Sequence, residues 1–217
     1  MDHELKTPQL YLASQSPRRA ELLRQVGIRF DCVSAPVDET LAPGEAAEHY
    51  VQRLAEAKAK AGWKQVLAQQ LPELPVLGAD TSVVLDGAVL GKPVDRADGL
   101  AMLAALSGRS HQVMTAVCLY SHDVRQLALS VSEVTFRHLS LDECEHYWQT
   151  GEPADKAGGY AIQGRAAIFI EQLQGSYSGV VGLPLLETWQ LLEDYERRHP
   201  PGVAQLAMSR LHDDKPA

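Results

Sequence analysis

The sequence predicts an α/β layered domain, and three observations support this fold class. Strand-like and helix-like segments alternate along most of the chain. Asp86-Gly87 separates two apolar runs, which is typical of a two-residue hairpin turn. The 217 residues, 45% hydrophobic and 22% charged, are enough to bury a large core. We therefore expect one domain over residues 1–199 and a poorly ordered tail over 200–217, where the composition shifts.

The first expected strand and helix meet at a sequence typical of an anion-binding helix start. The apolar run Leu10–Ala13 predicts a strand, and a helix from Pro17 to Val26 follows it, with Ser16 as N-cap. Arg18 and Arg19 then place positive charge at the positive end of the helix dipole. An anion bound at the helix N-terminus would resolve this conflict, and solvation of both side chains is the alternative. Gly27 should end the helix.

A second strand over 30–34 is expected to lead into a long helix from Ala46 to Ala61, ending at Gly62. Helical spacing places Lys58 on the apolar face centred on Val51. Lys58 is thus an inward-facing cation that either binds phosphate or extends past the core to water. Glu56 and Lys60 should form an i,i+4 pair on the outer face.

The hairpin of 76–85 and 88–90 carries a carboxylate inside an apolar strand. Asp80 is costly to bury unless it is paired, hydrogen-bonded or metal-bound, although it could instead face solvent at a strand end. Counting back from the turn places Lys92 opposite Thr81, and Pro93 should end the pairing. An acid and a lysine so close together could bind a metal–phosphate group or form an ion pair.

The rest of the chain should contain three helices, three strands and a glycine-rich loop. Within the loop, Gln163 offers an amide donor and acceptor suited to an imide edge such as that of uracil or thymine. The expected elements are helices over 97–106, 141–150 and 184–197, strands over 112–120, 127–136 and 167–173, and the glycine-rich loop over 151–164.

Composition excludes several functional classes. A net charge of −8 argues against nucleic acid or a membrane surface as a partner. Three widely spaced cysteines indicate neither a disulfide framework nor a zinc site. The N-terminus lacks an apolar signal core, and no run is long enough to span a membrane, so a cytoplasmic location is expected.

These segments together resemble the Maf family of nucleoside triphosphate pyrophosphatases over about Leu10 to Leu192. Six motifs in the expected order carry the resemblance, and together they are highly specific. They are Ser14-Gln15-Ser16-Pro17-Arg18-Arg19 with Asp38-Glu39-Thr40 and Lys58, Gly78-Ala79-Asp80-Thr81, Gly91-Lys92-Pro93, Asp155–Gly164, Gly175-Ser176-Tyr177 and Val180–Pro184.

The resemblance implies a central mixed, twisted sheet with a cleft between two lobes, usually in a homodimer. It also implies hydrolysis of a nucleoside triphosphate to the monophosphate and pyrophosphate with Mg²⁺ or Mn²⁺. Arg18, Thr81 and Gln163 fit the branch similar to dTTP/UTP pyrophosphatases rather than the one acting on 7-methyl-GTP. The competing hypothesis is a non-catalytic nucleotide-binding regulator of septum formation or cell shape.

Each motif residue then has a hypothetical role. Cations would surround the triphosphate, as phosphoryl transfer requires. Asp80 would hold the metal with Glu39 and also act on the attacking water. The expected substrate-binding residues are Arg18, Arg19, Lys58, Thr81, Lys92 and Gln163.

Overall fold

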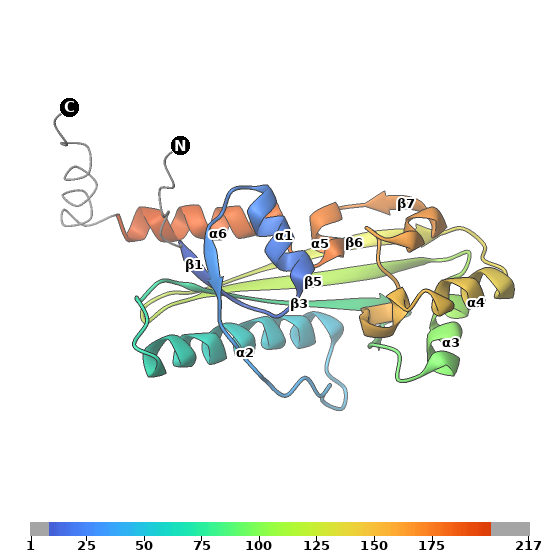
Figure 1. Cartoon of the computed structure of the whole chain (residues 1–217), viewed down its shortest axis with the longest axis horizontal. Coiled ribbons are helices and arrows are strands. Elements are labelled where there is room, and N and C mark those ends of the chain that lie inside the picture. Colours follow the sequence, from blue (N-terminus) through green and yellow to red (C-terminus); the bar gives the residue numbers. More distant parts are fainter. Residues whose placement is uncertain (1–8, 201–217) are drawn as a thin grey trace.

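The computed structural model describes residues 9–200 and contains a seven-stranded mixed sheet flanked by helices (Figure 1). The strand order is β2-β1-β3-β5-β6-β7, and β4 pairs with β3 beside this path. β1 is parallel to β2 and β3, whereas the other pairs are antiparallel. The expected fold class is therefore confirmed. The tail predicted over 200–217 lies outside the described residues except for Pro200.

Strands and helices are interspersed along the chain, with two strand pairs in succession, β3–β4 and β5–β6, and three 3-10 turns after α4. In chain order they are β1 (Leu10–Ala13), α1 (Pro17–Gln25), β2 (Phe30–Cys32), α2 (Ala47–Ala68), β3 (Val76–Leu85), β4 (Ala88–Leu90), α3 (Arg96–Leu106), β5 (Ser110–Tyr120), β6 (Arg125–Phe136), α4 (Leu141–Gln149), η1 (Glu152–Asp155), η2 (Ala157–Gly159), η3 (Arg165–Phe169), β7 (Ile170–Gln174), α5 (Tyr177–Val181) and α6 (Leu185–Arg198).

The predicted end of the long helix at Gly62 was wrong, because α2 continues to Ala68. Gly62 is a packing residue in this helix. A Cβ there would lie 2.8 Å from Cγ1 of Val76 and 3.0 Å from Cβ of Ala13. The glycine therefore lets α2 approach the sheet closely, and the neighbouring strands outweigh its low helix propensity.

The prediction for the segment before the last helix was also partly wrong. Residues 165–169 form a 3-10 turn, so β7 begins only at Ile170. The expected turn after this strand contains the short helix α5, whose N-cap side chain, Ser176, accepts a hydrogen bond from Gly179 N. A five-residue helix is too short to leave a periodic pattern in the sequence.

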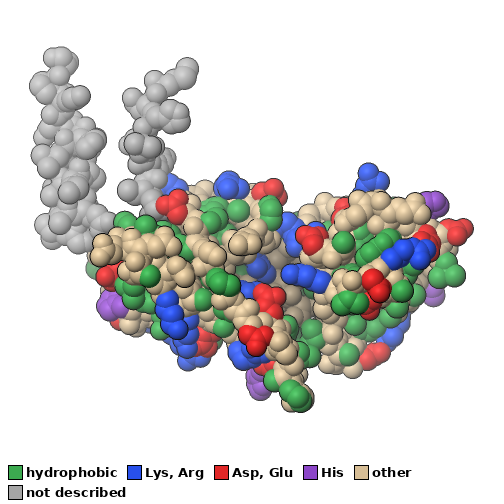
Figure 2. Space-filling view, turned by 60° about the horizontal axis from the view of Figure 1, so that its bottom comes forward, with side chains coloured by type: hydrophobic (Ala, Val, Ile, Leu, Met, Phe, Trp, Pro, Cys, Tyr) green, Lys and Arg blue, Asp and Glu red, His purple; other side chains and the backbone are tan. Residues whose placement is uncertain are grey.

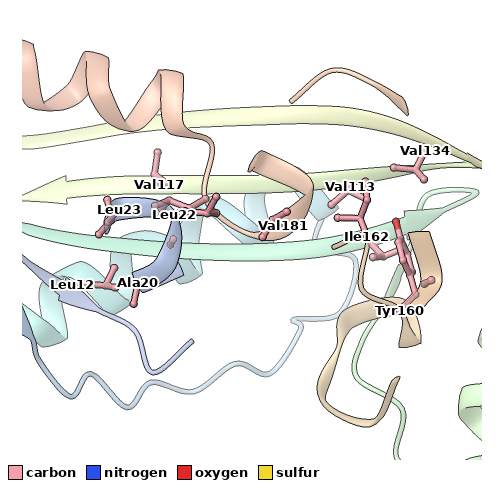
Figure 3. Packing of buried hydrophobic residues seen from close by; sticks show 14 of the residues in the cluster. Leu12, Ala20, Leu22, Leu23, Val113, Val117, Val134, Tyr160, Ile162 and Val181 are labelled. Carbon is pink, nitrogen blue, oxygen red and sulfur yellow. The ribbon is translucent and has the colours of Figure 1, made fainter. Parts of the chain in front are cut away.

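Helices cover both faces of the sheet (Figure 1). α2 packs on one face against β3 and β5, and α5 and α6 pack on the other face, with α1 against α5. Figure 3 shows the core beneath α1 and α5, where the side chains of Leu12, Ala20, Leu22, Leu23, Val117 and Val181 lie together. Among the described residues no helix is long and apolar enough to cross a membrane.

A gap in the strand pairing of β3 marks the site. β5 pairs with β3 along Val76–Val84 on one edge. The opposite edge of β3 is shared: β1 pairs only as far as Gly78, and β4 pairs only from Val83. Residues 79–82 therefore have no strand neighbour on that edge, and Asp80, Thr81 and Ser82 line a cleft there.

Candidate functional site

A cleft of about 730 Å³ lies at the gap between β1 and β4. Figure 2 shows this face hollowed near its middle, with Lys and Arg side chains (blue) and acidic side chains (red) bordering the hollow. All eight residues that the sequence singled out line the cleft. They are Arg18, Arg19, Glu39, Lys58, Asp80, Thr81, Lys92 and Gln163.

Strand alternation sends Asp80 and Thr81 to opposite faces of the sheet. Asp80 faces α2, where its Oδ1 accepts a hydrogen bond of 2.7 Å from Lys58 Nζ. The inward orientation predicted for Lys58 is therefore confirmed. Gly78, on the same face as Asp80, makes this possible: a Cβ there would lie only 2.3 Å from Ala55 O. The close helix–strand approach brings Lys58 to Asp80.

Lys58 also binds the second carboxylate of the site. Its Nζ lies 2.6 Å from Glu39 Oε1, so one ammonium joins Glu39 and Asp80. Glu39 belongs to the loop before α2, and Tyr50 holds this loop by donating a hydrogen bond of 2.7 Å to Glu39 O. The predicted outer pair is present as well, with Lys60 Nζ 2.5 Å from Glu56 Oε1.

The two carboxyl groups differ in their proton affinity. Burial raises the pKa of Asp80 above its ordinary value, although Lys58 and Arg19 oppose this effect. Burial also acts to raise the pKa of Glu39, but the hydrogen bond and charge of Lys58 outweigh it, and the net pKa is lowered. Glu39 is therefore the more strongly ionised of the pair, and Asp80 is closer to the proton affinity of a useful base.

Thr81 faces α1 and α5, where it joins a network around Arg19. The guanidinium of Arg19 donates to Gly182 O at 2.8 Å, to Ser14 Oγ at 3.1 Å and to Thr81 Oγ1 at 3.2 Å. Three of its five N–H groups are thus held by the protein, and two stay available for a ligand. Arg19 is fixed in place at the cleft wall, as a phosphate-binding arginine requires.

Thr115 of β5 continues this network into the core. Its side chain is fully buried, and its hydroxyl lies 2.7 Å from Gly179 O and 3.0 Å from Thr81 Oγ1. Thr115 therefore connects β3, β5 and α5 behind Arg19. Sequence reasoning missed it, because a single threonine within an apolar strand carries no distinctive signal.

The start of α1 lacks a side-chain cap. Ser16 occupies the N-cap position, but its side chain does not cap the helix, and Pro17 stands in the first turn. The uncapped backbone N–H groups of Arg18 and Arg19 thus stay available to a phosphate. Ser14 Oγ instead accepts from Ser16 N at 3.2 Å, which shapes the turn before the helix.

Lys92 lies at the cleft but not in the predicted ladder position. The register Leu85↔Ala88 agrees with the two-residue turn, yet the ladder ends at Val83↔Leu90. The pairing of Lys92 opposite Thr81 was therefore wrong. Gly91 O instead accepts from Gly158 N at 2.9 Å, which diverts the chain toward the glycine-rich loop. The charge of Lys92 still reaches the site, since it helps to lower the pKa of Glu39.

Three residues that line the cleft have side chains with open hydrogen-bonding groups. Within residues 9–200, the side chains of Arg18, Lys92 and Gln163 form no hydrogen bond or ion pair. Within residues 9–200 no hydrogen bond joins Gln163 to Thr81 or Arg18, so Gln163, Thr81 and Arg18 come together only as lining of one cleft. Side chains that line a pocket with open donors and acceptors are suited to bind a ligand.

The residues present fit a divalent cation bound together with substrate. The described part of the chain contains no group of three or more His, Cys, Asp or Glu residues able to hold a metal alone. However, Mg²⁺ is commonly bound through one or two carboxylates and substrate phosphates. Glu39 and Asp80, which already share the ammonium of Lys58, are such a pair.

Comparisons with known proteins find relatives that match most of this chain. The chain is 53% identical over 195 residues to the "dTTP/UTP pyrophosphatase" of Aromatoleum aromaticum, covering 86% of this chain and 95% of the relative. It is 55% identical to the protein of the same name from Alkalilimnicola ehrlichii, covering 87% and 94%. The Staphylococcus aureus Ham1 protein matches 58% of this chain and 71% of its own at 14% identity, with a TM-score of 0.40.

The family assignment follows from the match that spans almost the whole fold. The family model of the Maf-like proteins covers residues 9–195, which include every element from β1 to most of α6. The chain therefore belongs to the Maf-like protein family.

Proposed function

We propose that this protein hydrolyses dTTP and UTP to the nucleoside monophosphate and pyrophosphate. The observation that carries the proposal is the convergence of cations, among them Arg19, Lys58 and Lys92, with the carboxylates of Glu39 and Asp80 on one cleft, in a chain whose relatives are named dTTP/UTP pyrophosphatases. Cations that neutralise the phosphates and carboxylates that bind a metal are the parts that phosphoryl transfer needs.

The cations are arranged to hold the triphosphate. Arg19 contributes its two open N–H groups, and the start of α1 offers backbone N–H groups beside them. Lys58 uses two of its three donors on Glu39 and Asp80, so the third can reach a phosphate oxygen. Arg18 and Lys92 add unpaired charge at other points of the cleft.

Asp80 is the proposed base of the reaction. Water adds to a phosphorus atom of the α–β anhydride, the bridging P–O bond breaks, and the water proton passes to the Asp80 carboxylate. The raised pKa of Asp80 favours this transfer, and Lys58 fixes the carboxylate through Oδ1. When bound, a Mg²⁺ or Mn²⁺ ion held by Glu39 and Asp80 would neutralise phosphate charge and acidify water.

Gln163 is proposed to recognise the base. Its amide can pair with the donor and acceptor of a uracil or thymine edge. Arg18, which also lines the cleft, would contribute to substrate choice. Thr81 is also proposed to face the base, and its hydroxyl, which accepts from Arg19 and lies 3.0 Å from Thr115 Oγ1, helps to fix Arg19.

A substrate panel with product identification tests the reaction. Purified protein with Mg²⁺ is incubated with dTTP, UTP, CTP and 7-methyl-GTP, and chromatography distinguishes monophosphate plus pyrophosphate from diphosphate plus phosphate. We expect dTTP and UTP to be cleaved fastest and chelation of the metal to stop turnover. Preference for 7-methyl-GTP would contradict the substrate assignment, and tight binding of nucleotide without products would support the regulator hypothesis.

Asp80→Asn tests the assignment of the base. The amide keeps the size of the side chain but can neither take a proton nor hold a metal well. We expect turnover to fall at least about 100-fold with an unchanged circular dichroism spectrum. Near-normal turnover in a folded variant would refute the role.

We further propose that the protein acts as a cytoplasmic homodimer, the usual arrangement that the family resemblance implies. Light scattering coupled to gel filtration of the purified chain gives its mass in solution. A monomer throughout the micromolar range would contradict the dimer.

A further inference from the structure

The loop that carries Gln163 is held from behind by two side chains that do not line the cleft, Tyr147 of α4 and Glu152 of η1. The hydroxyl of Tyr147 donates to Glu152 Oε1 at 2.7 Å and accepts from Ala161 N at 3.2 Å. Glu152 Oε2 accepts from Arg165 N at 3.1 Å. The backbone is therefore anchored on both sides of Gln163, two residues before it and two residues after it.

The anchors lie in a well-packed environment. Tyr147 is buried, and its ring packs edge-to-face on Phe169 with centroids 5.1 Å apart. The Glu152 carboxylate lies directly against the loop: a Cβ on Gly164 would be 2.4 Å from Oε1. Burial, together with Glu152, raises the pKa of Tyr147, so the hydroxyl keeps the proton that it donates. The hydrogen bonds of Tyr147 and Glu152 thus fix the loop backbone at Ala161 and Arg165.

Gln163 depends on this backbone for its direction. The side chain is exposed in the cleft and forms no hydrogen bond with another described residue. Contacts from its own amide therefore do not orient it before a ligand arrives. A shift of the loop would misplace the amide relative to the base and weaken the hydrogen bonds that select that base.

We propose that Tyr147 and Glu152 are positioning residues that set base selectivity by holding Gln163. This inference rests on the proposed function, in which Gln163 reads the pyrimidine edge. It adds two residues from α4 and η1 to the specificity machinery, neither of which contacts the substrate.

Tyr147→Phe and Glu152→Gln test the proposal with little change of shape. We expect the preference for UTP over CTP in kcat/KM to fall about tenfold in each variant, as a lost or misplaced hydrogen bond in a recognition site predicts. The change should appear in KM, with kcat within about twofold, because Asp80, Glu39 and Lys58 are held by other elements. Tyr195→Phe is the matched control, since its hydroxyl contacts Ser121 away from the cleft.

A double variant distinguishes positioning from a general loss of structure. If Tyr147 acts through Gln163, Tyr147→Phe should leave the UTP/CTP ratio unchanged in a Gln163→Ala background. Multiplicative effects of the two substitutions would overturn the proposal. The proposal would also be overturned if Tyr147→Phe and Glu152→Gln kept the parental UTP/CTP ratio while Gln163→Ala lost this preference.

Binding separates this inference from the proposed function. Calorimetric affinities for α,β-imido UTP and α,β-imido CTP give the same selectivity ratio without turnover. Absence of hydrolysis in the parent protein would refute the proposed function alone. If both positioning variants keep the parental binding ratio and Gln163→Ala loses it, the positioning role alone is refuted. If Gln163→Ala keeps the parental ratio, both base recognition by Gln163 and its positioning by Tyr147 and Glu152 are refuted.

Discussion

Replacing Lys58 with methionine should destabilise the protein through the charge that it leaves behind. Lys58 Nζ lies 2.7 Å from Asp80 and 2.6 Å from Glu39. The Asp80 side chain is only 10% exposed, whereas that of Glu39 is 49% exposed. Glu39 can therefore be solvated when Lys58 is lost, but Asp80 cannot, so the cost is concentrated at Asp80.

The expected loss of stability is about 3 kcal/mol at pH 8, at the lower end of the range for breaking a buried ion pair, because the cleft admits some water. For a chain of this size such a loss lowers the melting temperature by about 6–12 °C. Methionine is similar to lysine in length, so little packing is lost. The loss of stability therefore measures the removal of the Lys58 charge.

The effect should depend on pH in a defined direction. Burial already raises the pKa of Asp80 above 3.8, and without Lys58 the pKa rises further because an opposing charge is gone. The folded state then holds a proton more tightly than the unfolded state. Stability is therefore lost as pH rises from 3.8 through the folded-state pKa, and Lys58→Met should lie closer to the parent at pH 5 than at pH 8.

Urea unfolding followed by circular dichroism, with a chelator present to exclude metal, measures these differences. The control is Lys58→Met combined with Asp80→Asn, which removes the stranded charge and should recover most of the lost stability. Parental stability of Lys58→Met at pH 8, or no recovery in the double variant, would show that Asp80 is not a buried charge compensated by Lys58.

Three further predictions concern the core around the site. Thr115→Val should fold but lower kcat/KM about tenfold, because Thr81, which accepts a hydrogen bond from Arg19, loses its contact with the Thr115 hydroxyl. Steady-state assays measure this change, and unchanged kinetics would contradict the prediction. Gly78→Ala should lower the free energy of unfolding by about 3 kcal/mol or more, since its Cβ would lie 2.3 Å from Ala55 O, and a parental urea midpoint would exclude the clash. Burial lowers the pKa of His111 to about 4, below its usual 6.5, so stability should fall as pH drops from 6.5 to 4. His111→Gln should flatten that part of the unfolding profile, and an equally steep profile in the variant would exclude His111 as its source.

Local signals in the sequence predicted most elements well. Pro17 and Ser16 located the start of α1, and Asp86-Gly87 located the hairpin, because turns and helix starts depend on residues close together in the chain. Helical spacing alone placed Lys58 on the inner face of α2. Where the prediction was wrong, as at Gly62, a neighbouring strand overrode the local preference of glycine.

The site residues could be singled out from their motifs, but their partners could not. Asp80 and Thr81 are adjacent in the sequence, yet one contacts Lys58 and the other Arg19, on opposite faces of the sheet. Thr115 gave no signal, since its importance comes from the carbonyl of Gly179, 64 residues away. Such long-range pairs arise from the strand order, which local propensity does not encode.

The sequence by itself determined the fold class, the family resemblance and most of the charged residues at the cleft, since helix caps, hairpin turns and motifs are short-range features. Only the tertiary structure decided that β1 and β4 share one edge of β3 and leave residues 79–82 uncovered. It also decided that Lys58 joins two carboxylates, and that Tyr147 and Glu152 hold the loop of Gln163. The physical reason is that side-chain direction and burial depend on packing between elements distant in the chain.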